Sequence, residues 1–318
     1  MTHLFYTRFA VAKASLAFLL AAFVATGCAR KDEQAAFDTA EAAIAAFIEA
    51  AEKDDTATMQ RLLGPGSEDL VSSGDALQDK GDRAAFVAAY RKGNKLVADG
   101  DAAMTLVMGE KEWPFPIPVV KGSGGWYLDG AKGVDELVYR RVGANELGAI
   151  SVCRGFVEAQ QEYAAVGRDG DPAGIYALKL VSDEGMQNGL YWPTGDDEEP
   201  SPAGPFVASA AGEGYRATAG TPYHGYRYRL LYKQGENTNG GPREYFKNGL
   251  LTEGFALVAW PAEYEVSGVM TFIVNQDGVV FQKDLGEGTE AAVAAMDTFD
   301  HDSSWTAVTE ADPENGSG

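Results

Sequence analysis

Few side chains in this sequence form a pattern that is able to do nucleophilic chemistry. The chain has two cysteines and three histidines. Cys153 paired with His224 or His301 is the simplest nucleophilic arrangement available, but Cys153 lies in an apolar helical pattern that is typical of a buried, unreactive thiol. The sequence contains no His-Glu-x-x-His, Gly-x-Ser-x-Gly, Ser-x-x-Lys or Cys-x-x-Cys motif and no phosphate-binding glycine loop. We therefore expect no catalytic residues and keep a hydrolase, using carboxylates or Cys153, as an alternative.

An aromatic pair beside an acidic run has the composition of a binding surface. Tyr191 and Trp192 precede a proline and the acidic residues 196–199. This pattern predicts an exposed aromatic patch on a loop, with Asp196 and Asp197 beside it. Alternatively, these aromatic rings are buried and fill part of the core.

Arg140 and Arg141 are adjacent cations in an acidic chain. A guanidinium pair has the geometry to clamp a carboxylate. Paired arginines between domains more often bridge neighbouring acids, so both roles stay open for this pair.

The stretch Val24-Ala25-Thr26-Gly27-Cys28 resembles the processing site of bacterial lipoproteins. It follows two basic residues and an apolar run that is too short to span a bilayer. The pattern predicts a signal peptide over 1–27, acylation of the Cys28 thiol after cleavage, and a tether over 28–36. Ala25 replaces the usual leucine, so an ordinary cleaved signal peptide is the alternative. Ala29 in place of aspartate favours lipid anchoring at the periplasmic face of the outer membrane over the inner one.

The exported chain would be strongly acidic. Removal of residues 1–27 lowers Lys plus Arg from 26 to 24 and leaves Asp plus Glu at 47, so the net charge becomes −23. Nucleic acids and anionic lipid headgroups would be repelled, because binding to them depends on clustered Lys and Arg. With Cys28 acylated, Cys153 has no partner for an intramolecular disulfide, so stability must come from core packing.

Hydrophobic periodicity predicts an α+β protein with two modules. The first module, over 37–140, has N-terminal helices followed by a small antiparallel sheet, an order that resembles the nuclear-transport-factor-like cone. The expected helices are 38–53, 56–63 and 82–91, and the expected strands are 102–108, 113–120 and 125–129.

The second module, over 141–308, is predicted to pack a long helix on an antiparallel sheet. The helix is expected over 145–166, with Leu147 among its inward-facing residues. The expected strands are 226–233, 255–260, 269–274 and 279–281, with a last helix over 290–299. The acidic tail over 309–318 has the composition of a disordered segment.

Prolines alternate along the strand expected over 113–120. Pro114, Pro116 and Pro118 would leave one whole edge of this strand without hydrogen-bond donors. The pattern therefore predicts an edge strand. A proline-rich ligand for an aromatic groove is the alternative.

Several motifs, taken together, resemble one bacterial exported family, domain of unknown function 2950. The likeness runs from about residue 37 to residue 308 and implies export but no activity. Residues 145–285 also resemble, more loosely, the globular part of type II pseudopilins, which implies an interaction module. The motifs of the family are Trp113-Pro-Phe-Pro-Ile-Pro, Gly125-Trp-Tyr-Leu-Asp129, Arg140-Arg-Val-Gly-Ala-Asn-Glu-Leu147, Gly189-Leu-Tyr-Trp-Pro193, Gly254-Phe-Ala-Leu-Val-Ala259 and Ser267-Gly-Val-Met-Thr-Phe272.

The resemblance to this family also implies an acidic loop after the long helix, which favours calcium. Here Asp169 and Asp171 remain, but Pro172 and its neighbours replace the rest of the loop. Calcium usually takes six to eight oxygen ligands, so two carboxylates are too few unless other acidic residues fold over them. The sequence therefore favours a solvated turn here, with a calcium site at Asp169 and Asp171 as the alternative, and we expect no other cofactor.

Together these features favour a non-catalytic binding or scaffolding module of the cell envelope. We expect it to be held at a membrane by acylated Cys28 and to bind an envelope protein or a cell-wall component through the loops over 185–215. An envelope hydrolase is one alternative. The other is a small-molecule carrier with its ligand in the N-terminal module, which requires an open apolar cavity there.

Overall fold

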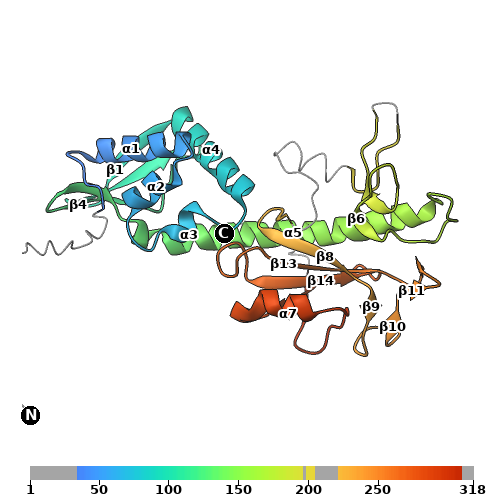
Figure 1. Ribbon diagram of the computed structural model, residues 1–318. Helices are drawn as coiled ribbons and strands as arrows, with labels where there is room; N and C mark the ends of the chain where they lie inside the picture. Colours follow the sequence, from blue (N-terminus) through green and yellow to red (C-terminus); the bar gives the residue numbers. More distant parts are fainter. Residues whose placement is uncertain (1–33, 196–197, 205–220, 310–318) are drawn as a thin grey trace, which may run out of the picture. The chain divides into compact units, whose positions relative to one another are not determined.

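The computed structural model describes residues 34–195, 198–204 and 221–309 (Figure 1). These residues form an α+β protein with N-terminal helices, an antiparallel sheet, a long helix and a second antiparallel sheet, so the predicted fold class is confirmed. The predicted signal peptide, the start of the tether and nearly all of the acidic tail lie outside the described residues. Within the described ranges no helix has both the length and the apolar character needed to cross a bilayer.

Four helices come first in the described part of the chain, and short polar side chains begin three of them. Thr39 accepts a hydrogen bond from the Ala42 amide at the start of α1 (3.1 Å), and Asp75 does the same for Gln78 at the start of α4 (3.1 Å). Each such cap contributes about 1 kcal/mol by satisfying an amide that has no helical partner. The helices are α1 (Ala40–Glu52), α2 (Thr56–Leu63), α3 (Glu68–Val71) and α4 (Ala76–Lys92).

The first sheet has the order β1-β2-β4-β5, with β3 paired to β2 beside β4. The strand expected over 113–120 is therefore divided, and its second part is not at an edge. β4 begins after the last proline and pairs with β2 on one side and β5 on the other, because a ladder between two neighbours needs the amide donors that proline lacks. The strands are β1 (Asn94–Ala98), β2 (Ala103–Met108), β3 (Trp113–Pro114), β4 (Val119–Gly122) and β5 (Gly125–Leu128).

Helix α1 and the first sheet share an apolar core. Ile44 on α1, Leu106 on β2 and Leu128 on β5 are at most 2% exposed and belong to one buried cluster. Burying each such side chain contributes about 1.5–3 kcal/mol. The helical spacing of Ile44 and Ile48, also buried, explains why this face of α1 lies on the sheet.

The long helix α5 (Val134–Ala165) follows a short 3-10 turn, η1 (Gly130–Lys132). It begins 11 residues before the predicted start at 145, so the module boundary drawn at 140/141 falls inside it. Leu147 is 70% exposed, which makes its predicted inward orientation wrong. Helix α5 instead buries the face that carries Ala149, Cys153 and Phe156.

The second sheet has the order β16-β15-β14-β13-β8 and is antiparallel throughout. Helices α5 and α7 contact it (Figure 1). On β8, Tyr226 joins the buried cluster that includes Cys153 of α5, while Arg229 donates hydrogen bonds to the Val293 and Met296 carbonyls at the end of α7. The elements are β8 (Tyr226–Leu231), β13 (Ala256–Pro261), β14 (Met270–Asn275), β15 (Phe281–Asp284), β16 (Thr306–Ala307), η2 (Gly286–Gly288) and α7 (Thr289–Ala295).

Three two-stranded ladders complete the described part of the chain. β6 (Lys179–Val181) and β7 (Gly189–Tyr191) pair in parallel, whereas the other two ladders are antiparallel. The antiparallel pairs are β9 (Lys233–Gln234) with β10 (Arg243–Glu244), and β11 (Phe246–Lys247) with β12 (Leu250–Leu251).

Candidate functional site

A pocket of about 360 Å³ opens among the N-terminal helices, the first sheet and the start of α5. Its volume lies near the lower end of the range of about 300–1,000 Å³ that small-molecule sites occupy. The floor consists of apolar side chains from α1, α2, α4 and the chain between β3 and β4. These are Phe47, Met59, Leu63, Phe86, Phe115 and Ile117.

Aromatic rings form one continuous part of this floor. The Phe86 ring lies 5.7 Å from Phe47 and 5.0 Å from Phe115, measured between ring centroids. Trp113 adjoins Phe115 at 6.0 Å, and the Arg140 guanidinium lies 5.6 Å from the centre of the Trp113 ring. A cation over an indole ring is attracted by the electrons of its face. The floor therefore suits both an apolar body and a positive charge.

The polar side chains of the pocket come from two helices. Gln78 and Asp79 lie on α4 one turn before Asp82 and Arg83, a spacing of four residues that places the two pairs on the same side of the helix. Arg140 and Arg141 lie on the N-terminal part of α5. The early start of α5 is what brings both arginines to the pocket.

Two of the three arginines are already paired with carboxylates. Arg83 lies 2.6 Å from an Asp54 oxygen, and Arg140 forms an ion pair with Glu136 one turn away on α5. Arg141 instead donates hydrogen bonds to the Asp69 carbonyl (2.7 Å) and to the Leu70 carbonyl. Arg140 and Arg141 thus do not form a shared clamp for a carboxylate.

The charged groups at the pocket differ in exposure: Asp79 is buried (7% exposed), Arg141 is half-buried and Asp82 is exposed. Partial desolvation by the surrounding protein raises the pKa of the Asp82 carboxyl above its ordinary value, and the Arg141 guanidinium opposes this shift. Burial also lowers the pKa of Arg141, against the opposing effect of Asp79 and Asp82. Displaced pKa values of this kind, next to a cavity, are characteristic of functional sites.

Asn145 connects the pocket to the second sheet region. Gln78 donates a hydrogen bond from Nε2 to the Asn145 Oδ1 (2.6 Å), and Asn145 donates from Nδ2 to the Ser267 carbonyl (2.8 Å). Asn145 is 1% exposed. At Gly225 (φ +71°), a Cβ atom would lie 2.3 Å from the Asn145 Nδ2, so only glycine fits there.

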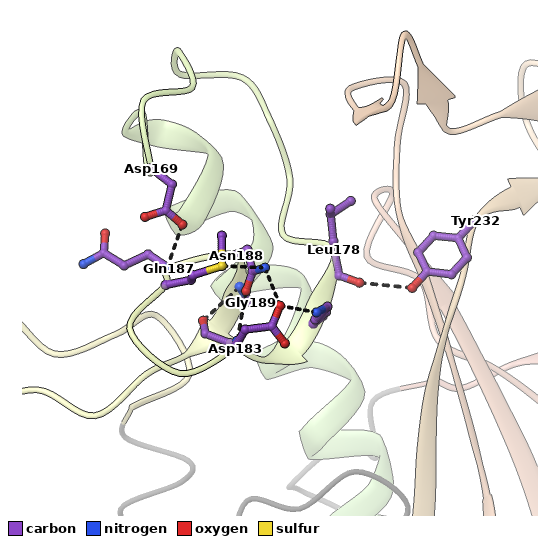
Figure 2. A network of polar contacts seen from close by, with 10 residues as sticks. Asp169, Leu178, Asp183, Gln187, Asn188, Gly189 and Tyr232 are labelled. Carbon is purple, nitrogen blue, oxygen red and sulfur yellow. Dashed lines mark hydrogen bonds and ion pairs between the residues drawn. The ribbon is translucent and has the colours of Figure 1, made fainter.

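The predicted calcium loop is held by hydrogen bonds within the chain (Figure 2). Asp169 adopts a left-handed backbone conformation (φ +51°), and its carboxylate accepts a hydrogen bond from the Gln187 amide (2.7 Å). Asp183 accepts from the Asn188 side chain (2.9 Å) and pairs with Lys179. Asp171 is exposed. In the part of the chain that the structure describes, no group of three or more His, Cys, Asp or Glu side chains is placed to hold a metal ion, so the calcium site stays a prediction.

The predicted aromatic patch is largely a core feature. Trp192 is only 9% exposed, which corrects the expectation that it lies on an exposed loop. Its ring contacts the Tyr163 ring edge-to-face (6.4 Å between centroids), and Arg168 lies 4.7 Å from its centre. Burying this large ring against α5 removes more apolar surface from water than an exposed position would. Tyr191 is half-buried at the end of β7, and Asp196 and Asp197 lie outside the described residues.

Cys153 is a fully buried side chain of α5. Burial raises the pKa of its thiol to about 12, so almost none of it is thiolate at neutral pH. This environment disfavours the nucleophilic role. Cys28, the predicted acylation site, lies outside the described residues.

A thiol-labelling experiment checks this assignment. In the secreted Cys28→Ser protein, Cys153 is the single remaining thiol. We expect Ellman's reagent to leave it unmodified in the native protein and to label it fully in guanidinium chloride, because only unfolding exposes it. Rapid stoichiometric labelling of the native protein would contradict the buried assignment.

One family model, described as "Protein of unknown function (DUF2950)", matches residues 34–308. The chain belongs to this family. The searches of the curated proteins and of the solved structures found no match to this chain. The looser likenesses of this DUF2950 protein to pseudopilins and to the nuclear-transport-factor-like cone therefore stay predictions.

A pocket in the N-terminal module was expected only for the carrier alternative, and apart from Arg140 and Arg141 its lining residues were not predicted, although they carry a signal. Asp79, Asp82 and Arg83 stand on the same side of α4 as Phe86, so charged and aromatic groups share one helical face. An ordinary surface helix separates the two kinds of residue. A charged residue within an apolar face is thus the sequence feature that could have located the site.

Proposed function

We propose that this DUF2950 protein is an exported, membrane-anchored binding protein that holds a small, largely apolar molecule in its N-terminal pocket. The open cavity of about 360 Å³ is the observation that carries the proposal. The pocket is open to solvent and its lining is mostly apolar, so an apolar molecule that enters it would remove this lining from water. The carrier alternative requires such a cavity. Binding through the loops over 185–215 has less support, because Trp192 of that region is buried.

The location is part of the same proposal. Acylation of Cys28 would hold the protein at the periplasmic face of a membrane, with the outer membrane favoured. The processed protein would have a net charge of −23, so anionic lipid headgroups would repel it. We propose a lipid anchor that leaves the pocket free to exchange its ligand with the periplasm or with a partner in the envelope.

Blocking the mouth of the pocket tests the proposal. Ala144 lines the pocket and is exposed on α5, so Ala144→Trp places a large ring there without removing a core side chain. We expect the neutral dye N-phenyl-1-naphthylamine to fluoresce on binding the secreted Cys28→Ser protein, and its affinity to fall about tenfold or more in Ala144→Trp, a loss of about 1.4 kcal/mol.

The matched control is Ser151→Trp, which adds the same ring at an exposed position of α5 that does not line the pocket. Its dye affinity should equal that of the parent. If the folded parent protein binds no dye, or if Ala144→Trp and Ser151→Trp bind it equally well, the proposed function is wrong.

A further inference from the structure

We infer that the ligand of this pocket is an amphipathic cation: a small apolar body that carries a protonated amine. The inference rests on the proposed function, because it names the chemistry of the molecule that the same pocket would hold. Three arginines line the pocket, so an anion would be the first expectation from composition. The pairing of the charges leads to the opposite conclusion.

The unpaired charges of the pocket sum to a negative value. Asp54 neutralises Arg83 and Glu136 neutralises Arg140, both through direct ion pairs. Among the described residues, Asp79, Asp82 and Arg141 form no ion pair, which leaves two carboxylates against one guanidinium. An anion would meet this excess of carboxylate, whereas a cation would compensate it.

The pocket also has hydrogen-bond acceptors that are not fully used. Arg141 already donates to two backbone carbonyls, and Asp79 accepts from the Ser73 amide through only one of its oxygens. The Gln78 Oε1 is buried and accepts no hydrogen bond from the described residues. This buried acceptor therefore lacks a donor among the described residues, and a buried acceptor without a donor destabilises the protein. An ammonium group supplies three donors and no acceptor.

The apolar floor accounts for the rest of such a molecule. The rings of Phe47, Phe86 and Phe115 offer both contact area and aromatic faces within 6.1 Å of one another. Aromatic faces attract cations, as the position of Arg140 over Trp113 already illustrates. An aryl or short alkyl amine would place its body on these rings and its ammonium near Asp79 and Asp82.

Limited solvation of the two carboxylates gives a reason for the site to accept a cation, because Asp79 is 7% exposed and the more exposed Asp82 is partly desolvated by its neighbours. Desolvation raises the pKa of Asp82 against the opposing charges of Arg141 and Arg83, so its charged form is disfavoured in the free protein. Groups facing it are Asp79, Asp75, Arg83 and Arg141. A bound ammonium would add a favourable charge at short range and offset this cost.

Competition among three matched molecules tests the inference. Tryptamine, tryptophol and indole-3-propionate share the indole ring and the two-carbon linker, and differ in bearing an ammonium, a hydroxyl or a carboxylate. Each is titrated into the complex of the secreted Cys28→Ser protein with N-phenyl-1-naphthylamine. We expect tryptamine to displace the dye at about tenfold lower concentration than tryptophol, and indole-3-propionate to be the weakest.

Asp82→Asn identifies the group responsible. This variant should lose about tenfold in tryptamine affinity and keep its affinity for tryptophol, which shows that the pocket is still folded. Asp101→Asn removes an equal charge at an exposed position that does not line the pocket, and should change neither affinity.

The outcomes separate this inference from the proposed function. Dye binding that Ala144→Trp abolishes supports the function whatever charge the ligand bears. The inference is overturned if indole-3-propionate competes as well as tryptamine, if tryptamine is no better than tryptophol or displaces no dye, or if Asp82→Asn leaves the tryptamine affinity unchanged.

Discussion

Cys28→Ser should move the exported protein from the membrane fraction to the soluble fraction, and this is the largest effect we expect of a single substitution. The proposed anchor is the set of acyl chains on the Cys28 thiol, and a serine at this position has no thiol to carry them. Each buried methylene contributes about 0.8 kcal/mol, so the loss of two or three chains changes membrane partitioning by many orders of magnitude. Fractionation of the producing cells, together with metabolic labelling by palmitate, measures both consequences.

Cys153→Ser is the matched control for the anchor. It removes the other thiol of the chain, which is fully buried, and should leave the protein labelled and in the membrane fraction. Palmitate labelling that persists in Cys28→Ser would contradict the anchor. So would a native mature protein whose first residue is not Cys28.

Asn145→Asp should be the most damaging conservative substitution for stability. It keeps the size of the side chain but replaces the donor to the Ser267 carbonyl with an acceptor, at a site that is 1% exposed. The new carboxylate would face a carbonyl oxygen and would also lie near Asp75, whose carboxylate accepts from the Gly225 amide. We expect a loss of about 3 kcal/mol or more in the free energy of unfolding, because the variant buries an unpaired charge.

Urea denaturation of the secreted Cys28→Ser protein, with and without Asn145→Asp, measures this loss. Asn94→Asp makes the same change at an exposed residue of β1 and should alter the free energy of unfolding by no more than about 0.5 kcal/mol. Because a buried carboxyl is tolerated when protonated, the loss in Asn145→Asp should shrink as the pH falls. Equal midpoints for the two variants would show that Asn145 does not hold these elements together.

Asn145 also connects the pocket to the rest of the protein. The neighbouring residue, Ala144, lines the pocket. The Asn145 side-chain oxygen Oδ1 accepts the hydrogen bond from Gln78. On the next residue, the Glu146 carboxylate accepts from the Val269 and Met270 amides, each at 3.0 Å. One stretch of α5 therefore forms a wall of the pocket and a support for β14. Substitutions at Asn145 should be judged by dye binding as well as by stability.

The sequence predicted those elements whose stability comes from a regular pattern close along the chain. The apolar spacing of α1 and α2 and their caps at Thr39 and Asp55 place both helices within two residues of their predicted bounds. The strands expected over 269–274 and 279–281 are likewise found as β14 and β15, which pair in an antiparallel ladder. Local hydrogen bonds and burial of one face suffice for such elements, so their own residues determine them.

The start of α5 and the division of the proline strand depended on distant contacts. Gly143 weakens a helix by about 1 kcal/mol relative to alanine, so the local pattern does not indicate the early start of α5. The helix nevertheless runs through it, because Leu137 packs against the first core and Val142 is buried. β4 lies between β2 and β5 because its neighbours supply partners on both edges.

The amino-acid sequence by itself determined the α+β class, the family and the predicted anchor site at Cys28, since each is carried by a contiguous pattern of residues. Only the tertiary structure decided that Trp192 is buried and that a pocket exists with more free carboxylates than free guanidiniums. Cavities and charge balance depend on which side chains meet across α4, α5 and the first sheet. Which of these side chains meet is set by packing between elements far apart in the chain, and no local pattern of residues encodes it.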